Sequence, residues 1–186
     1  MQMRKKSLIL GSVILALGLL GSLYWWKGQG GSLKPYEPKK DRAALIQLFR
    51  QNWYWLDDRE LEGGLKAFEE TLNKVGDPAF ATRLDVMDWT VYRSKGEARA
   101  FISYFMRDSA EKVGKILYLA VDDRFRARGI ARQLMTKAID VLTKKGAKII
   151  EIVTRISNHP AQNLYRSMGF VQVGEDETFV FMELRV

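Results

Sequence analysis

Residues 119–134 read LAVDDRFRARGIARQL, and this stretch is the most informative one in the chain of 186 residues. An apolar strand ends at Val121, a polar loop follows, and a helix begins near Gly129. The first turn of a helix carries N–H groups without intrahelical acceptors and a partial positive charge, so this junction can bind a pyrophosphate. Gly129 and the small Ala131 let the backbone approach a phosphate closely. Three arginines add positive potential: Arg124, Arg126 and Arg128. Taken alone, the stretch would be better explained as an ordinary basic surface loop before a helix.

A second motif follows this stretch at residues 158–170, which fit the pattern N-x-x-A-x-x-L-Y-x-x-x-G-F. Its defined positions are Asn158, Ala161, Leu164, Tyr165, Gly169 and Phe170. The first stretch matches neither of the common nucleotide motifs, GxGxxG and GxxxxGK(S/T). Instead, residues 126–131 fit the pattern Q/R-x-x-G-x-G/A after a strand that ends in LAV. In this order, with a helix and a strand between them, the two motifs resemble the GNAT superfamily of acyl-CoA-dependent N-acetyltransferases. The resemblance covers about residues 34–186.

The resemblance implies that acetyl-CoA lies between two splayed parallel strands, residues 115–121 and 148–154. Backbone groups near Leu119 and Val121 would bind the pantetheine arm. Asn158 would contact the pantetheine region or the start of the next helix, and its alternative role is a plain cap of that helix. The loop residues expected to bind the pyrophosphate, through their amides and their positive charge, are Arg126, Ala127, Arg128, Gly129, Ile130 and Ala131.

Acetyl transfer to an amine needs a neutral nucleophile, stabilisation of the charge that develops on the acyl oxygen, and a proton for the leaving thiolate. The resemblance implies that a strand amide near Leu119 stabilises the oxygen and that Tyr165 donates the proton. The alternative for Tyr165 is a core aromatic residue. Where several family members carry a Glu as base, this chain has Lys115. Tyr118, Glu151, a water chain and an amine that arrives neutral all stay open as alternatives.

Apolar periodicity predicts an α/β domain. Helices are expected at about 41–51, 59–74, 129–145 and 160–168, and strands at about 88–93, 98–106, 115–121, 148–154, 170–174 and 178–185. This order indicates a mixed sheet flanked by helices. The GNAT resemblance makes it a mostly antiparallel central sheet with one splayed parallel pair.

The positive charge of the chain lies mostly near its N-terminus. The net charge is +8, and residues 1–42 carry six of these charges, which argues against a nucleic-acid partner for the rest. Basic residues flank the uncharged run 7–26, whose length as a helix matches the hydrocarbon layer of about 30 Å. Tyr24, Trp25 and Trp26 close the run, where aromatic rings favour the headgroup layer. The run predicts one transmembrane helix, with a cleavable signal peptide or a buried helix as alternatives.

These features divide the chain into four parts: a basic flank at 1–6, a transmembrane anchor at 7–26, a flexible Gly-rich linker at 27–35 and a GNAT-like domain at 36–186. We expect the domain in the cytosol, because acetyl-CoA is a cytosolic metabolite and an outward-facing domain would lack its donor. In addition, more basic residues follow the run than precede it. The usual arrangement of signal anchors, which keeps a short basic N-terminus inside, opposes this orientation.

The acceptor is expected to be a primary amine of a small molecule or a protein that enters opposite the CoA. Two loops at this entrance are acidic and would attract a cation or simply be solvated: Asp57, Asp58 and Glu60 in one, Glu175, Asp176 and Glu177 in the other. Trp53, Tyr54 and Trp55 could form an aromatic wall, contact lipid headgroups or fill the core.

A catalytically silent acyl-CoA-binding or interaction module is the competing function. The chain has no Cys and a single His, His159, which excludes thiolate zinc sites and multi-His clusters. No metal is therefore expected.

Overall fold

The computed structural model describes residues 30–56, 64–74 and 87–186. Chain contacts group Leu33–Val186 into one compact unit. In the described residues, a seven-stranded sheet has the order β1-β2-β3-β4-β5-β7-β6. The strands are β1 (Ser32–Pro35), β2 (Asp88–Ser94), β3 (Glu97–Asp108), β4 (Val113–Val121), β5 (Ile149–Arg155), β6 (Val171–Glu175) and β7 (Phe179–Arg185). The expected mixed, mostly antiparallel sheet is confirmed, because β4 and β5 are parallel whereas β2–β3, β3–β4, β5–β7 and β6–β7 are antiparallel.

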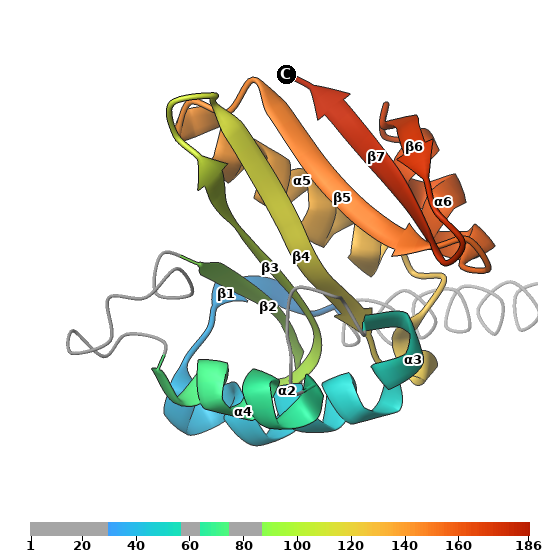
Figure 1. Cartoon of the computed structure of the whole chain (residues 1–186). Coiled ribbons are helices and arrows are strands. Elements are labelled where there is room, and N and C mark those ends of the chain that lie inside the picture. Colours follow the sequence, from blue (N-terminus) through green and yellow to red (C-terminus); the bar gives the residue numbers. More distant parts are fainter. Residues whose placement is uncertain (1–29, 57–63, 75–86) are drawn as a thin grey trace, which may run out of the picture. The chain divides into compact units, whose positions relative to one another are not determined.

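The parallel pair diverges partway along its length. Residues 113–116 of β4 pair with residues 149–152 of β5, and beyond this point the two strands separate into the V seen in Figure 1. Each strand keeps its outer neighbour, because β4 stays paired with β3 as far as Val121 and β5 stays paired with β7 as far as Arg155. Leu117 is an extra residue in β4, since Ser103 pairs with Tyr118 and Tyr104 pairs with Ile116. The bulge therefore lies where the divergence begins.

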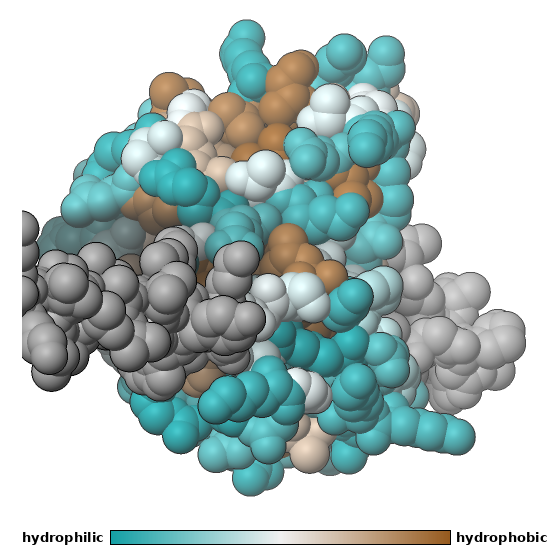
Figure 2. Space-filling model, turned by 180° about the vertical axis from the view of Figure 1, so that it is seen from behind, coloured by the Kyte–Doolittle hydropathy of each residue, from teal (hydrophilic) through white to brown (hydrophobic). Residues whose placement is uncertain are grey.

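Helices cover both faces of the sheet. They are α2 (Pro38–Gln51), α3 (Trp53–Leu56), α4 (Gly64–Lys74), α5 (Ile130–Lys144) and α6 (His159–Arg166). Apolar residues of α5 and α6 pack with Ile102, Ile116 and Ile150 on one face, whereas α2 and α4 pack with Phe101 and Tyr118 on the other. Figure 1 shows α5 and α6 behind the sheet. Seen from behind, the surface is mostly hydrophilic with smaller apolar areas, as expected for amphipathic helices that bury one face (Figure 2).

The compact unit begins earlier than expected. Residues 32–35 belong to the expected flexible linker, yet they form β1. Leu33 packs against the core cluster, and the Tyr36 N–H donates to the Trp89 carbonyl at 3.2 Å. A glycine-rich composition does not reveal these long-range contacts, so the linker prediction was wrong at its C-terminal end.

Several predicted parts lie outside the described residues: the basic flank 1–6, the anchor 7–26, the start of the linker at 27–29 and the start of the helix expected at 59–74. Within the part of the chain that the structure describes, none of the helices combines the length and apolar character needed to span a bilayer.

Candidate active site

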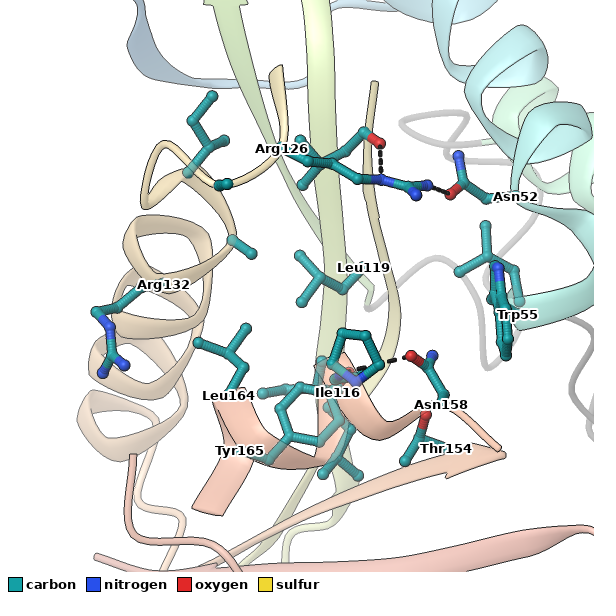
Figure 3. Close-up of a pocket in the computed structure, with 18 of the residues that line it drawn as sticks. Asn52, Trp55, Ile116, Leu119, Arg126, Arg132, Thr154, Asn158, Leu164 and Tyr165 are labelled. Carbon is teal, nitrogen blue, oxygen red and sulfur yellow. Dashed lines mark hydrogen bonds between the residues drawn. The ribbon is translucent and has the colours of Figure 1, made fainter. Parts of the chain in front are cut away.

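A cavity of about 470 Å³ lies where β4 and β5 diverge. Its apolar walls include Ile116 and Leu119 from β4 and Ile152 from β5. Figure 3 places Arg126 and Asn52 at one end of the cavity and Tyr165, Ile116 and Asn158 at the other. The cavity therefore joins the loop after β4 to helix α6, the two segments that carry the sequence motifs.

Asp122 shapes the loop that follows β4. Its carboxylate accepts hydrogen bonds from the Arg124 backbone N–H at 3.1 Å and from the Arg124 guanidinium at 2.8 Å. The hydrogen bonds from Arg124 hold the pKa of Asp122 below its usual range. The Phe125 N–H donates to the Asp122 carbonyl at 2.7 Å. Asp122 thus turns the chain out of the strand and toward α5.

The loop enters α5 through two residues with left-handed backbone conformations, Ala127 at φ 57° and Gly129 at φ 74°. Helix α5 begins at Ile130, and its first intrahelical bond runs from the Gln133 N–H to the Gly129 carbonyl at 3.1 Å. The N–H groups of residues 129–132 therefore lack intrahelical acceptors, and Gly129 has no side chain that could cap them. Ala127, Gly129, Ile130 and Ala131 line the cavity, so the positive end of α5 faces it.

The two predicted arginines of this loop lie differently. Arg126 lines the cavity and donates to the Asn52 Oδ1 at 2.7 Å. The Arg128 side chain is not part of the lining. Its guanidinium donates to the Arg124 carbonyl at 2.8 Å and lies 5.0 Å from the centre of the Phe125 ring. For Arg128, the backbone amide rather than the side chain therefore stays the candidate for phosphate binding.

At the other end of the cavity, α6 supplies Asn158 and Tyr165. Asn158 caps α6, because its Oδ1 accepts a hydrogen bond from the Ala161 N–H at 3.3 Å, and it also lines the cavity. Tyr165 is 5% exposed. Burial raises the pKa of its hydroxyl well above the ordinary value of 10.0, so Tyr165 is protonated at neutral pH.

The sequence profile of the acetyltransferase (GNAT) family matches residues 41–170, which include both motifs and both diverging strands. The chain belongs to this family. It is therefore an acyltransferase enzyme with the GNAT fold.

Individual similar proteins are also N-acetyltransferases by name. An uncharacterized N-acetyltransferase of Archaeoglobus fulgidus is 28% identical over 127 residues, covering 60% of this chain and 86% of the relative. The ribosomal protein bS18-alanine N-acetyltransferase of Haemophilus ducreyi is 44% identical over 55 residues, or 30% of this chain and 38% of that protein. The PaiA N-acetyltransferase of Thermoplasma acidophilum, solved with coenzyme A, has a TM-score of 0.67 at 14% identity, covering 84% and 99% of the two chains. Family membership supports acetyl-CoA as co-substrate.

The candidate bases Glu151 and Tyr118 lie in two places, and Lys115, which stands where several family members have a Glu, lies beside Glu151. Lys115 and Glu151 pair across the parallel strands and line a second cavity of about 380 Å³. The Glu151 carboxylate accepts a hydrogen bond from Arg107 at 2.8 Å. Tyr118 is buried against Phe49 and Phe68 and lines neither of the two cavities. Of the three residues, Lys115 and Glu151 therefore face a space that a ligand can enter.

One of the two acidic loops lies in the described part of the chain, and it differs from a simple charged rim. Asp57, Asp58 and Glu60 lie outside the described residues. Asp176 orders the turn between β6 and β7, because its Oδ1 accepts hydrogen bonds from the Thr178 and Phe179 N–H groups at 2.8 and 2.9 Å. Within the described residues, no three His, Cys, Asp or Glu side chains gather closely enough to hold a metal ion.

Sequence reasoning missed Asn52 and did not assign Trp55 to the cavity. Both line it, from the end of α2 and from α3. Asn52 follows a helix and carries no motif, so only its position in space distinguishes it. The aromatic run 53–55 was a visible signal, and its members differ: Trp55 lines the cavity, whereas Tyr54 is 55% exposed and stacks on Arg155 with the guanidinium 4.4 Å from its ring centre.

Proposed function

We propose that this acetyltransferase transfers an acetyl group from acetyl-CoA to a primary amine of a protein or small molecule, and that residues 7–26 anchor it in a membrane. One observation carries the catalytic part of the proposal. A single cavity between the diverging strands is lined at one end by the N-terminus of α5 and at the other by the buried hydroxyl-bearing Tyr165.

The residues present fit acetyl-CoA. The amides at the start of α5 and Arg126 would hold the pyrophosphate, because free N–H groups and positive charge favour an anion there. The backbone near Leu119 and Val121 would bind the pantetheine arm, and Asn158 lies at the opposite end of the lining. When bound, acetyl-CoA supplies the activated acyl group as a thioester. Tyr165 would donate a proton to the departing sulfur, because its hydroxyl is protonated at neutral pH and the residue lines this cavity.

The second cavity is the route that we propose for the acceptor. It shares the lining residues Ile152 and Val153 with the first cavity, so both spaces adjoin β5. Its lining mixes apolar residues such as Phe179 and Phe181 with Lys115 and Glu151. The names of relatives, a ribosomal protein bS18-alanine N-acetyltransferase and an N-alpha-acetyltransferase 30, support a protein α-amine as the first acceptor class to test.

Gly129 offers a sharp test of the proposed pyrophosphate loop. At Gly129 an added Cβ would meet no atom within 4 Å, but the φ of 74° strains any L side chain. Gly129→Ala and Gly129→Glu should therefore lose similar stability, whereas only the Glu variant places a negative charge at the helix N-terminus. We expect calorimetric titration with CoA to show much weaker binding for Gly129→Glu than for Gly129→Ala. Equal affinities in folded variants would remove this loop from the binding site.

The competing hypothesis of a silent acyl-CoA-binding module rests on Lys115 where several family members have a Glu, and the family match at residues 41–170 argues against it. Release of free thiol from acetyl-CoA, measured against a panel of peptides and small amines, separates the two functions. An active enzyme turns over with at least one acceptor. A silent module binds CoA and releases no thiol above the rate without protein.

A further inference from the structure

Asn52 joins three parts of the active-site region. It is 5% exposed and lies directly after α2. Its side-chain Nδ2 donates to the Leu48 carbonyl at 2.8 Å. The backbone carbonyl of Asn52 accepts from the Trp55 and Leu56 N–H groups at 2.9 and 3.1 Å. These bonds fix the side-chain amide at the junction of α2 and α3, with Oδ1 directed at Arg126 (Figure 3). The opposite placement of the amide oxygen and nitrogen would set an NH₂ group against a guanidinium, so the chemistry of the contacts determines the orientation.

Three acceptors among the described residues contact the Arg126 guanidinium: a buried side chain from Asn52, a buried backbone carbonyl from Val121 and an exposed carboxylate from Asp123. The Asn52 Oδ1 lies 2.7 Å from Nη2, and the Val121 carbonyl lies 3.4 Å from Nε. Asp123 forms an ion pair at 2.7 Å, but its side chain is 73% exposed, and exposed ion pairs are weak because water screens them. Arg126 itself is half exposed, so a long side chain with many rotamers depends on Asn52 for its position at the cavity.

We propose that Asn52 is a positioning residue for CoA binding. It holds the Arg126 guanidinium at the end of the cavity where the pyrophosphate is expected, so the cation is in place before the ligand arrives. Holding the side chain in advance lowers the entropic cost of binding. A neutral acceptor is suited to this task, because a carboxylate at residue 52 would cancel the positive charge that attracts the phosphates. The inference rests on the proposed function, since it requires CoA in this cavity.

The test compares two ligands, CoA and pantetheine, which lacks the pyrophosphate and the nucleotide. Dissociation constants are measured on the full-length protein in detergent, by calorimetry for CoA and by NMR titration for pantetheine. We expect Asn52→Ala to weaken CoA binding about tenfold, the size of one lost hydrogen bond to a charged group. Pantetheine binding should not change. If Asn52→Ala acts only by disturbing α2 and α3, it should weaken the binding of CoA and of pantetheine alike, and that result would overturn the proposal.

A double-mutant cycle asks whether the effect passes through Arg126. Adding Asn52→Ala to Arg126→Ala should not weaken CoA binding further. Arg132→Ala is the matched control, because Arg132 also lines the cavity but donates to Ser167 at 2.7 Å rather than to Asn52. In that background Asn52→Ala should keep its full effect. Additive losses with Arg126→Ala would overturn the proposal.

Asn52→Asp carries the same test if the Ala variant does not fold. This variant keeps an acceptor for Arg126, but the new carboxylate neutralises the charge of the guanidinium. CoA should therefore bind at least about tenfold more weakly, and pantetheine binding should not change. Unchanged or tighter CoA binding would overturn the inference while leaving the proposed function intact. Failure of the unaltered protein to bind CoA would instead overturn the proposed function, and the inference with it.

Discussion

Tyr165 is the residue on which the proposed chemistry depends most. Tyr165→Phe removes the hydroxyl but keeps the ring, whose centre lies 6.0 Å from the centre of the Phe170 ring. We expect turnover to fall about 10²-fold or more with CoA affinity nearly unchanged, because the hydroxyl acts on the departing sulfur and the ring carries the packing. Thiol release under conditions where chemistry limits the rate measures the effect. Unchanged turnover in a folded variant would make Tyr165 a core residue only.

Burial of the same hydroxyl makes stability depend on pH. Burial raises the pKa of Tyr165 above 10.0, the value expected in the unfolded chain, so above pH 10 the unfolded state loses its proton first. The unfolded state then binds fewer protons than the native state, so the free energy of unfolding falls as the pH rises through this window. Tyr165→Phe should show a shallower fall between pH 9 and pH 11 in chemical denaturation. Parallel curves for the two proteins would contradict the assignment.

Helix α2 is held to the sheet by a buried ion pair between Arg93 of β2 and Asp41. Arg93 Nε donates to Asp41 Oδ1 at 2.8 Å, and Nη2 donates to Oδ2. Asp41 is fully buried and also accepts from the Glu37 N–H at 2.8 Å, where α2 begins. This pair places α2, and with it Asn52 at the end of the helix, beside the cavity.

Breaking this pair should destabilise the fold. Arg93→Met leaves the buried Asp41 carboxylate without its counter-charge and should lower the free energy of unfolding by about 3–5 kcal/mol. Asp41→Leu should cost less, because Arg93 keeps an ion pair with Glu37 at 2.8 Å. The double variant should recover much of this loss, because two apolar side chains need no counter-charge. Urea denaturation of the three variants measures the effect. Losses in the single variants that simply add in the double variant would show that the pair does not act as a unit.

The attachment of the domain to a membrane is argued from the sequence, and it leads to a test of orientation. The full chain should sediment with membranes, and removal of residues 1–29 should release the domain. We expect the domain in the cytosol, because the donor is made there and the flank after the run is the more basic one. A protease added to intact cells should therefore leave the domain uncut until the membrane is opened. Digestion in intact cells would place it outside.

Local patterns in the sequence determined the elements that carry the chemistry. The period of apolar residues indicates the strand before the loop at 122–129 and the helix after it, and Gly129 indicates a backbone that can approach a phosphate closely. Helix α5 and the strands on either side of it lie within two residues of their predicted bounds. These features depend on neighbours along the chain, so the chain alone reveals them.

Only the tertiary structure decided which distant groups meet. The bulge at Leu117 and the divergence of β4 from β5 arise from pairing with β3 and β7, and β1 joins the sheet although its composition is typical of a linker. Asn52 and Arg126 are 74 residues apart in sequence and share a hydrogen bond. Arg128, two residues from Arg126, turns its side chain to Phe125 instead. Such contacts depend on the packing of separate elements, and packing depends on the whole fold rather than on any local pattern of residues.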